Sequence, residues 1–321
     1  MGEFDLIDRF FKRASRRADV GIGDDCALLS PRPGHQLALS TDMLVEGRHF
    51  LSTVDPERLG HKSLAVNLSD LAACGAEPRA FLLSLSLPRA DERWLSGFSQ
   101  GLFKLADTHG CELIGGDTTQ GPLNISITVI GDVPQGQALL RNGARAGDDI
   151  YVSGTLGDAR LALEAFRGLQ NLPESVFSGC RARMELPTPR VGLGMALRGI
   201  ASAAADISDG LLGDLGHILR QSGVGARVQV DVCERLLACR QALALPSEWV
   251  RTCVLAGGDD YELVFTASPA HREAVLQAAQ ASQTAVTCIG TVTASTVLDL
   301  RDAQGQALAT HFASFDHFAQ G

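Results

Sequence analysis

Aspartates beside glycine, serine or threonine recur in six short segments of the sequence. The segments are Gly23-Asp24-Asp25, Thr41-Asp42, Ser69-Asp70, Gly115-Gly116-Asp117, Asp206-Ile207-Ser208-Asp209-Gly210 and Gly257-Gly258-Asp259-Asp260. One such segment alone is typical of a turn, because glycine supplies positive φ and aspartate hydrogen-bonds its own backbone. Asp42, Asp70, Asp117 and Asp206 instead fall within or beside predicted strands and helices. Elements of this kind can aim a catalytic carboxylate into a cleft.

Several carboxylates gathered at one site would require cations. Two carboxylates about 4 Å apart repel by roughly 4 kcal/mol at an effective dielectric constant near 20. The sequence has only Lys12, Lys62 and Lys104 as lysines. Hard divalent ions with oxygen ligands, Mg²⁺ first, are the natural neutralisers, and Mg²⁺ is commonly shared with substrate phosphates. Serine and threonine hydroxyls beside the acids would add neutral ligands, so the pattern predicts metal-assisted phosphate chemistry.

The familiar phosphate-binding motifs are absent from the sequence. No lysine follows a glycine, as a P-loop requires, and the protein-kinase signatures His-Arg-Asp and Asp-Phe-Gly do not occur. Gly21-Ile22-Gly23 has no third glycine at the spacing of a dinucleotide-binding fold. Any phosphate chemistry would therefore be done mainly by metals.

Hydrophobic periodicity in the first half predicts alternating strands and helices. Apolar residues at helical spacing predict helices over 3–17, 61–74 and 92–109. Alternation predicts a strand over 36–40, which delivers Ser40-Thr41-Asp42 at its end, and further strands over 82–87 and 123–129. Asp70 falls in the middle of the second predicted helix.

A change in composition over 131–149 predicts a domain boundary, with domains at 1–138 and 139–321. The second half begins with a strand over 150–154 and a helix over 158–166. A short strand over 203–207 leads through Ser208-Asp209-Gly210 into another helix. The strand content and the hairpin-like alternation favour an α+β class over a doubly wound parallel sheet.

Composition excludes several classes of protein. The formal net charge is -9, so no basic stripe exists to displace counterions from nucleic acid. Eight cysteines show no CxxC pair, which is typical of a reduced cytoplasmic protein. No stretch approaches the length of a membrane span. We expect a soluble cytoplasmic protein that binds neither nucleic acid nor membrane.

Taken in order, the motifs resemble those of the thiamine-monophosphate kinase family. The matching segments are the six above, extended to Gly21 through Ala27, to Glu46-Gly47-Arg48-His49-Phe50, to Asn67 through Ala73, to Thr119, to Leu211 and to Leu263, and the closing Phe315-Asp316-His317-Phe318. Each motif is modest alone, but the ordered set is specific and covers essentially the whole chain.

The resemblance implies the two-domain α+β fold of the aminoimidazole ribonucleotide synthetase-like superfamily. In that fold the N-terminal domain would hold the metal and nucleotide site and would pair in a homodimer, and the C-terminal domain would close the active site. The implied reaction is thiamine monophosphate plus ATP giving thiamine diphosphate plus ADP, in thiamine diphosphate biosynthesis.

The resemblance also implies roles for individual residues. The expected Mg²⁺ ligands are Asp25, Ser40, Thr41, Asp42, Asp70, Asp117, Asp206 and Asp209, among which Asp42, Asp70 and Asp209 would act in catalysis. The expected ATP contacts are Gly116, Asp117, Arg141 and Ser208. Thiamine monophosphate would meet His49, Asp259 and Phe315, a position where family members often have tyrosine or tryptophan.

The chemistry implied by the family agrees with this inventory. The acceptor phosphate is already anionic, so no side-chain base is needed, and positioning with charge neutralisation would suffice for direct in-line transfer without a phosphoenzyme. Two other functions stay open at this point. One is a related ATP-dependent enzyme that activates an amide or selenide and differs at His49, Asp259 and Phe315. The other is a non-catalytic, metal-binding dimer.

Plainer roles also stay open for single residues. Asp24 and Asp260 could shape turns or support neighbouring ligands, Arg141 could be a solvated loop arginine, and Phe315 could anchor the tail.

Overall fold

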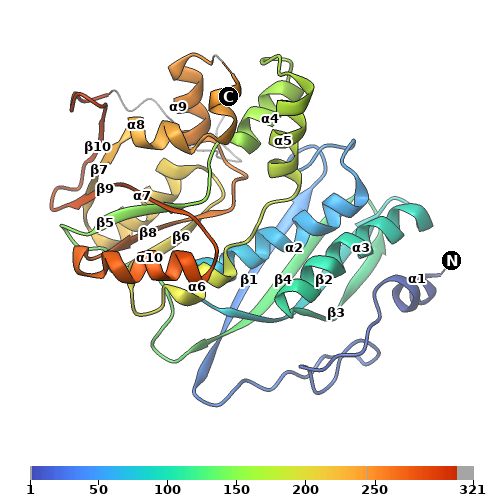
Figure 1. Ribbon diagram of the computed structural model, residues 1–321. Coiled ribbons are helices and arrows are strands. Elements are labelled where there is room, and N and C mark those ends of the chain that lie inside the picture. The colour runs from blue at the N-terminus through green and yellow to red at the C-terminus, as the bar shows by residue number, and fades with distance from the viewer. Residues whose placement is uncertain (1, 244, 309–321) are drawn as a thin grey trace. The chain divides into compact units, whose positions relative to one another are not determined.

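The computed structural model describes residues 2–243 and 245–308, which form two compact units (Figure 1). The first unit extends to Gly136, except for Ala72–Gly75, and the second unit contains those four residues and the chain from Gln137 onward. Each unit has its own mixed β-sheet with helices packed on it. The predicted α+β class is confirmed.

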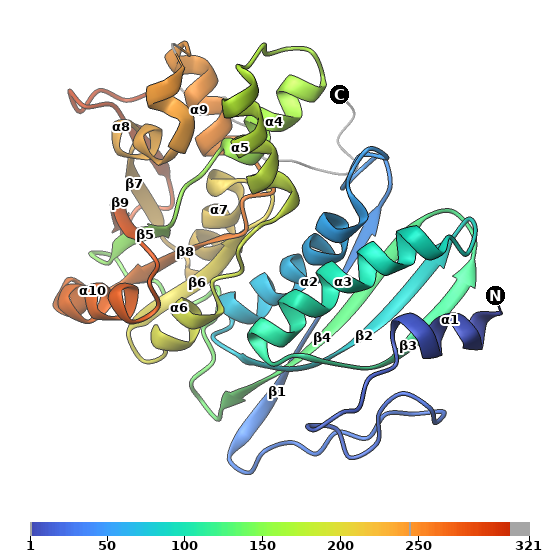
Figure 2. The same ribbon diagram turned by 45° about the vertical axis from the view of Figure 1, so that its right-hand side comes forward.

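The sheet of the first unit has four strands. In spatial order they are β1 (His35–Val45), β4 (Asn124–Pro134), β2 (Glu77–Leu87) and β3 (Glu112–Gln120). Only the β2–β3 pair is parallel. Helices α2 (Pro56–Ala73) and α3 (Glu92–His109) lie across one face of this sheet (Figure 2). Leu83 and Leu85 of β2 are buried on that side, whereas Ser84 between them is exposed, so one face of the sheet carries the core.

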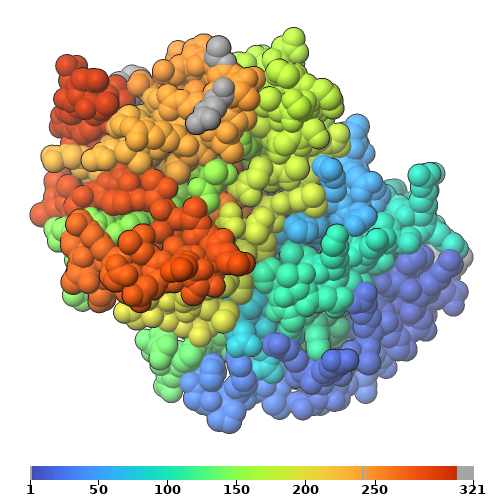
Figure 3. Space-filling view, in the orientation of Figure 1, coloured from blue at the N-terminus to red at the C-terminus, as the bar shows by residue number. Residues whose placement is uncertain are grey.

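Helix α1 (Glu3–Phe10) packs beside α3, where Figure 3 shows the dark blue N-terminal segment against teal α3. The Phe11 ring meets the Phe98 ring edge-on at 6.4 Å between centroids. The Arg13 guanidinium lies 3.6 Å from the centroid of the Phe103 ring. These contacts fix the N-terminal segment on the first unit.

The first helix ends at Phe10 and is shorter than the predicted 3–17. The chain after it is hydrogen-bonded to a carboxylate instead of continuing the helix. Glu112 Oε2 accepts hydrogen bonds from Ser15 Oγ at 2.6 Å and from the Arg16 and Arg17 N–H groups at 2.9 and 3.0 Å. These bonds satisfy backbone donors outside a helix.

Two site residues occupy different places in their elements than the sequence predicts. Strand β1 continues past Ser40 to Val45, because its pairing with β4 runs on to the Val45–Asn124 pair. Asp42 therefore lies within the strand and not at its end. Asp70 lies in the last turn of α2, which ends at Ala73, and not in the middle of the helix.

The sheet of the second unit has six strands. In spatial order they are β10 (Leu298–Arg301), β7 (Gly225–Gln229), β9 (Val286–Thr293), β5 (Asp149–Ser153), β8 (Glu262–Ala267) and β6 (Ala201–Ile207). Every residue of β5 and of β8 is buried. The helices of this unit include α4 (Asp158–Phe166), α5 (Glu174–Glu185), α6 (Val191–Ala196), α7 (Leu211–Ser222), α8 (Val230–Cys233), α9 (Ser247–Ala256) and α10 (Arg272–Ala281).

The core of the second unit lies between its sheet and several of these helices. Leu215 and Ile218 of α7 are fully buried in the same apolar cluster as Ala205 of β6, Val264 of β8 and Val254 of α9. Because β6 and α7 are packed into this core, the loop between them has firmly held ends. That loop contains Ser208, Asp209 and Gly210.

Helices α2 and α3 approach each other through glycines. A Cβ added at Gly101 would lie 1.8 Å from the Glu57 carbonyl oxygen, and one at Gly60 would lie 2.0 Å from the Phe98 carbonyl oxygen. Both contacts are to backbone, which cannot swing away. Only glycine allows the two helices to lie this close.

The change Gly101→Ala should therefore lower the free energy of unfolding by about 1–3 kcal/mol, since the helices must separate. The matched control is Gly179→Ala in α5, where nothing lies within 4 Å of an added Cβ. The control should hold or gain up to about 1 kcal/mol from helix propensity. Urea unfolding of both variants measures the difference, and a Gly101→Ala protein as stable as the control would contradict the close approach.

Candidate active site

Three of the predicted metal ligands share one face of the first sheet. The Ser40 hydroxyl donates a short hydrogen bond to the Asp70 carboxylate, which joins β1 to α2. Asp42 is two residues further along β1, so its side chain points to the same face. The Asp42 N–H donates to Asn67 Oδ1 at 3.0 Å, and the amide of that buried Asn67 donates to the Ser63 carbonyl at 3.0 Å. The last turns of α2 thus position the strand and its acids.

Two other predicted ligands lie on the opposite face of this sheet. The Thr41 and Thr128 hydroxyls are hydrogen-bonded at 2.8 Å across β1 and β4. Asp117 of β3 pairs with Ser84, whose side chain is on the exposed side of β2. The structure therefore places Ser40, Asp42 and Asp70 on one side of the sheet. The side chains of Thr41 and Asp117 lie on the other side.

A cavity of about 1060 Å³ in the first unit is lined by three of the residues predicted there. Asp25, Gly116 and Asp117 line it together with α1 and with apolar side chains of β2 and β3. Gly116 has φ +144°, and a Cβ there would lie 1.9 Å from the Leu83 carbonyl oxygen, so only glycine fits. Asp24 Oδ1 accepts the Asp25 N–H at 2.9 Å, which is the turn role considered for Asp24. The result is a hollow with both acidic and apolar walls.

His49 follows β1 in the loop that closes at Phe50. Its Nδ1 accepts the Val45 N–H at 3.0 Å, so in the neutral imidazole the proton is on Nε2. The buried Lys62 ammonium donates to the His49 carbonyl oxygen at 3.2 Å. The loop is thereby fixed to α2, and the imidazole has a defined tautomer.

In the second unit, one carboxylate organises the loop between β6 and α7. Asp214 Oδ2 accepts the N–H groups of Ser208, Asp209 and Gly210 at 3.1, 3.1 and 3.2 Å. Burial raises the pKa of Asp214 to about 6, although the three backbone hydrogen bonds favour its ionised form. The sequence analysis missed this residue. The available signal is an aspartate four residues into a helix that follows Ser-Asp-Gly.

A second acidic loop, 257–261, is tied to the first one by backbone hydrogen bonds. The Asp259 N–H donates to the Ser208 carbonyl and the Tyr261 N–H to the Ile207 carbonyl, both at 2.9 Å. The Tyr261 hydroxyl donates to Asp259 Oδ1 at 3.1 Å. Asp259 and Tyr261 have φ of +68° and +51°, a conformation that costs roughly 1–3 kcal/mol each and clusters at functional sites.

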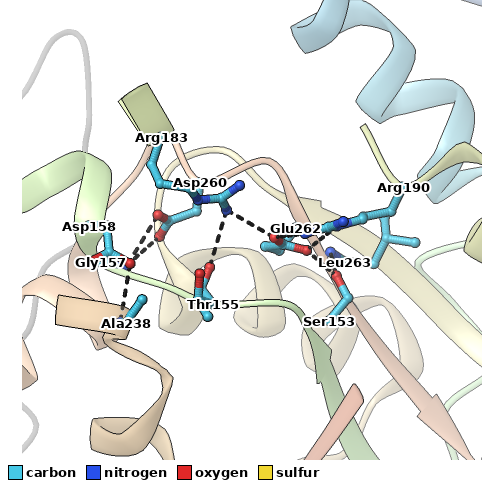
Figure 4. A network of polar contacts seen from close by, with 10 residues as sticks. All are labelled: Ser153, Thr155, Gly157, Asp158, Arg183, Arg190, Ala238, Asp260, Glu262 and Leu263. Atoms are coloured by element: carbon cyan, nitrogen blue, oxygen red, sulfur yellow. Dashed lines mark hydrogen bonds and ion pairs between the residues drawn. The ribbon is translucent and has the colours of Figure 1, made fainter. Parts of the chain in front are cut away.

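A buried polar network around Asp260 and Glu262 holds this second loop (Figure 4). Both Asp260 carboxylate oxygens accept the Gly157 N–H, at 2.9 and 3.1 Å, and burial raises the pKa of Asp260 well above its usual range. Fully buried Glu262 accepts from Ser153 Oγ at 2.5 Å, from Arg183 Nη2 at 2.9 Å and from Arg190 Nε and Nη2 at 2.6 Å each. Asp260 and Glu262 therefore support the loop, while Asp259 is the acid of the loop that is not buried.

Asp206, Arg141 and Phe315 complete the set of predicted residues. Asp206 is buried at the sixth position of β6, before the loop that Asp214 holds. The Arg141 carbonyl accepts the Ser222 hydroxyl at 3.4 Å, at the end of α7. Burial, then the Arg220 and Arg141 charges, lower the pKa of His217 on α7, whereas Asp209 opposes them. Arg141 is exposed, and it belongs to the same unit as Ser208 and Asp209. Phe315 lies outside the residues that the structure describes.

Comparison with known proteins identifies the family. Residues 23–133 match the model of the N-terminal domain of AIR synthase related proteins, and residues 145–303 match that of the C-terminal domain. The thiamine-monophosphate kinase of Salmonella typhimurium is 46% identical over 326 residues, which cover 99% of this chain and 98% of that protein. The chain belongs to the thiamine-monophosphate kinase family. The resemblance seen in the ordered motifs is confirmed.

Solved structures of thiamine-monophosphate kinases have the same fold. The crystal structure of the Stenotrophomonas maltophilia enzyme superimposes with a TM-score of 0.82 at 45% identity, and covers 95% of this chain and 96% of that one. AaThiL complexed with AMPPCP and TMP superimposes with a TM-score of 0.74 at 30% identity, and covers 90% of this chain and 89% of that one. As a thiamine-monophosphate kinase family member, the chain is an enzyme, a phosphotransferase. Within residues 2–243 and 245–308, no helix has the length and apolar character to cross a bilayer.

Glu262→Ala should lower the free energy of unfolding by about 3 kcal/mol or more, because Arg183 and Arg190 would lose their buried carboxylate. The control Asp299→Ala removes an acid that pairs with Arg227 and Arg301 near the surface. It should change stability by about 1 kcal/mol or less. Chemical denaturation compares the two, and equal losses would show that the Glu262 network does not support the loop.

Proposed function

We propose that the chain transfers the γ-phosphoryl group of ATP directly onto thiamine monophosphate, assisted by several Mg²⁺ ions held by its aspartates. Membership of the thiamine-monophosphate kinase family supports the substrate pair, as does the AaThiL complex with AMPPCP and TMP. The observation that carries the proposal is the grouping of Ser40, Asp42 and Asp70 at one end of α2. Carboxylates gathered on one face favour divalent cations, and phosphoryl transfer uses them.

The donor set fits Mg²⁺, because every proposed ligand offers a carboxylate or hydroxyl oxygen. The proposed ligands are Asp25, Ser40, Thr41, Asp42, Asp70, Asp117, Asp206 and Asp209. Because Thr41 and Asp117 point to the opposite face of the first sheet from Ser40 and Asp42, they would hold different ions. When bound, Mg²⁺ would supply charge neutralisation between the two phosphate groups and a template for their alignment. Asp42, Asp70 and Asp209 would act in catalysis by holding these ions.

The protein groups themselves bind and orient the substrates. Ser40 holds the Asp70 carboxylate through its hydroxyl, and Asn67 holds the β1 backbone at Asp42. Gly116 and Asp117 border the large cavity of the first unit, which we propose receives ATP, with Arg141 and Ser208 as further nucleotide contacts. His49, Asp259 and Phe315 are assigned to thiamine monophosphate. The acceptor phosphate is already anionic, so no residue needs to remove a proton, and transfer proceeds without a phosphoenzyme.

We also propose that residues 1–138 form the domain for metal, nucleotide and dimer contacts. Residues 139–321 form a second domain that contributes Asp206, Asp209 and Asp259. A homodimer is supported by the apolar side chains on the exposed face of β1. Leu39 is 64% exposed and Met43 is 55% exposed there. Large apolar side chains grouped on one strand are typical of an interface. The cytoplasmic location stays a prediction.

Activity should depend on Mg²⁺ and on the acids at the end of α2. EDTA should abolish formation of thiamine diphosphate from thiamine monophosphate and ATP, and added Mg²⁺ should restore it. Asp42→Asn and Asp70→Asn should each lower kcat by roughly 10²-fold or more, since charge stabilisation of the transition state is lost. The control Asp107→Asn removes an exposed acid that pairs with Arg13 and should keep kcat.

Turnover undiminished in metal-free buffer would contradict this assignment. ATP consumption with an amide or selenide acceptor, and none with thiamine monophosphate, would favour the related enzymes. Absence of any ATP turnover would favour the non-catalytic, metal-binding dimer.

Leu39→Asp should convert the dimer to a monomer, because a carboxylate would be buried at the interface without a partner. The matched control is Leu276→Asp on α10, a leucine that is 57% exposed in the second unit. It should leave the assembly unchanged. Light scattering coupled to size exclusion gives both masses. A wild-type monomer, or a Leu39→Asp protein with the wild-type dimer mass, would contradict this interface.

A further inference from the structure

The loop between β6 and α7 is held by a carboxylate that comes from its own helix. Asp214 is the fourth residue of α7, and its side chain turns back toward the start of the helix. It is only 4% exposed. One oxygen, Oδ2, accepts three consecutive N–H groups at 3.1–3.2 Å. The positive end of the helix dipole, at the start of α7, further favours an anion at this place.

Three successive N–H groups that converge on one point form a nest of the kind that binds phosphate in other proteins. Here the nest is filled by Asp214, so it has no donor left for a nucleotide phosphate. The Ser208 carbonyl is also engaged, because it accepts the Asp259 N–H at 2.9 Å. Three N–H groups of the loop and the Ser208 carbonyl are therefore engaged within the protein. The groups that we assign to ligands in this loop are side-chain oxygens, the Ser208 hydroxyl and the Asp209 carboxylate.

Glycines in both loops allow the two backbones to pack closely together. Gly210 has φ +121°, and a Cβ there would lie 2.9 Å from the Ala256 carbonyl carbon. A Cβ at Gly258 would lie 2.4 Å from the Ser208 carbonyl oxygen. The loop is thus closely packed against the 257–261 loop. On its other side, its shape depends on the hydrogen bonds that Ser208, Asp209 and Gly210 donate to Asp214.

We propose that Asp214 is a positioning residue, which fixes Ser208 and Asp209 so that their side-chain oxygens form a ready-made cation site. This inference rests on the proposed function, in which Asp209 holds Mg²⁺ and Ser208 contacts ATP. Asp214 itself contacts neither metal nor substrate. Its carboxylate occupies the three N–H groups that could otherwise bind a phosphate. The loop then presents side-chain oxygens, which suit a cation.

The test compares Mn²⁺ binding, as a spectroscopic replacement for Mg²⁺, with kcat and melting temperature in four variants of the full chain. Asp214→Ala removes the acceptor of the three N–H groups. Residues that orient metal ligands typically contribute 10–100-fold to metal affinity, so the Mn²⁺ dissociation constant should rise by about that factor. Asp214→Asn keeps an oxygen that can accept the same bonds and should fall between Asp214→Ala and the wild type.

The matched control is Asp149→Ala. Asp149 is also a buried acid, 3% exposed, and it accepts hydrogen bonds from Arg272 Nε and Nη2 at 2.6 and 2.9 Å. Neither Asp149 nor Arg272 is a proposed site residue. Asp149→Ala should lower the melting temperature as Asp214→Ala does, but it should leave the Mn²⁺ dissociation constant and kcat unchanged.

Two results would overturn the role of Asp214. One is a folded Asp214→Ala protein with wild-type Mn²⁺ affinity and kcat. The other is an equal loss of Mn²⁺ affinity in Asp149→Ala, which would reduce the effect to general destabilisation. The fourth variant, Asp209→Asn, separates this inference from the proposed function. If Asp209→Asn weakens Mn²⁺ binding and Asp214→Ala does not, the proposed role of Asp209 stands and only that of Asp214 is overturned. If Asp209→Asn binds Mn²⁺ like the wild type, the loop holds no metal, and the metal role of Asp209 in the proposed function is itself contradicted.

Discussion

Repulsion between carboxylates is the constraint on which the rest of this molecule depends. Half of the residues assigned to the site are aspartates, and Arg141 is the only lysine or arginine among them. In the first unit, the Ser40 hydroxyl binds the Asp70 carboxylate, and Asn67 of the same helix binds the backbone of Asp42. Acids so placed are tolerated when cations lie between them, so a chain of this composition is suited to bringing two anionic phosphates together. Family membership and this inventory of side chains point to the same chemistry.

The structure positions these acids through groups outside the set of proposed ligands. Asn67 holds the β1 backbone, Asp214 holds the loop before α7, and Glu262 holds the strand that follows Asp259. Each is a buried polar side chain whose hydrogen bonds are made to backbone, to arginine or, for Glu262, also to the Ser153 hydroxyl. Loss of such a partner leaves buried groups unsatisfied, which destabilises the protein more than loss of an exposed acid does. The site is therefore built by its supporting residues as much as by its proposed ligands.

Much of the fold could be predicted from local signals, and the errors have physical causes. The bounds predicted for α3 are those observed, because Asp91 caps its first turn and Gly110 ends it in the left-handed conformation. The length of β1 depends on its pairing with distant β4, so Asp42 could not be placed within the strand from local sequence. Asp214 was missed for a similar reason, since its importance lies in the direction of one side chain. The roles of the proposed ligands stay predictions.

Equilibrium binding of Mn²⁺, followed by electron paramagnetic resonance, tests the central claim most directly. The wild-type chain would be titrated with Mn²⁺ in the presence of AMPPCP and thiamine monophosphate, and Asp42→Asn would be titrated alongside it. The account predicts that the wild type retains more Mn²⁺ per chain than AMPPCP carries by itself, and that Asp42→Asn retains less. A wild-type protein that holds no Mn²⁺ beyond that carried by the nucleotide would contradict the claim that the aspartates bind the catalytic cations.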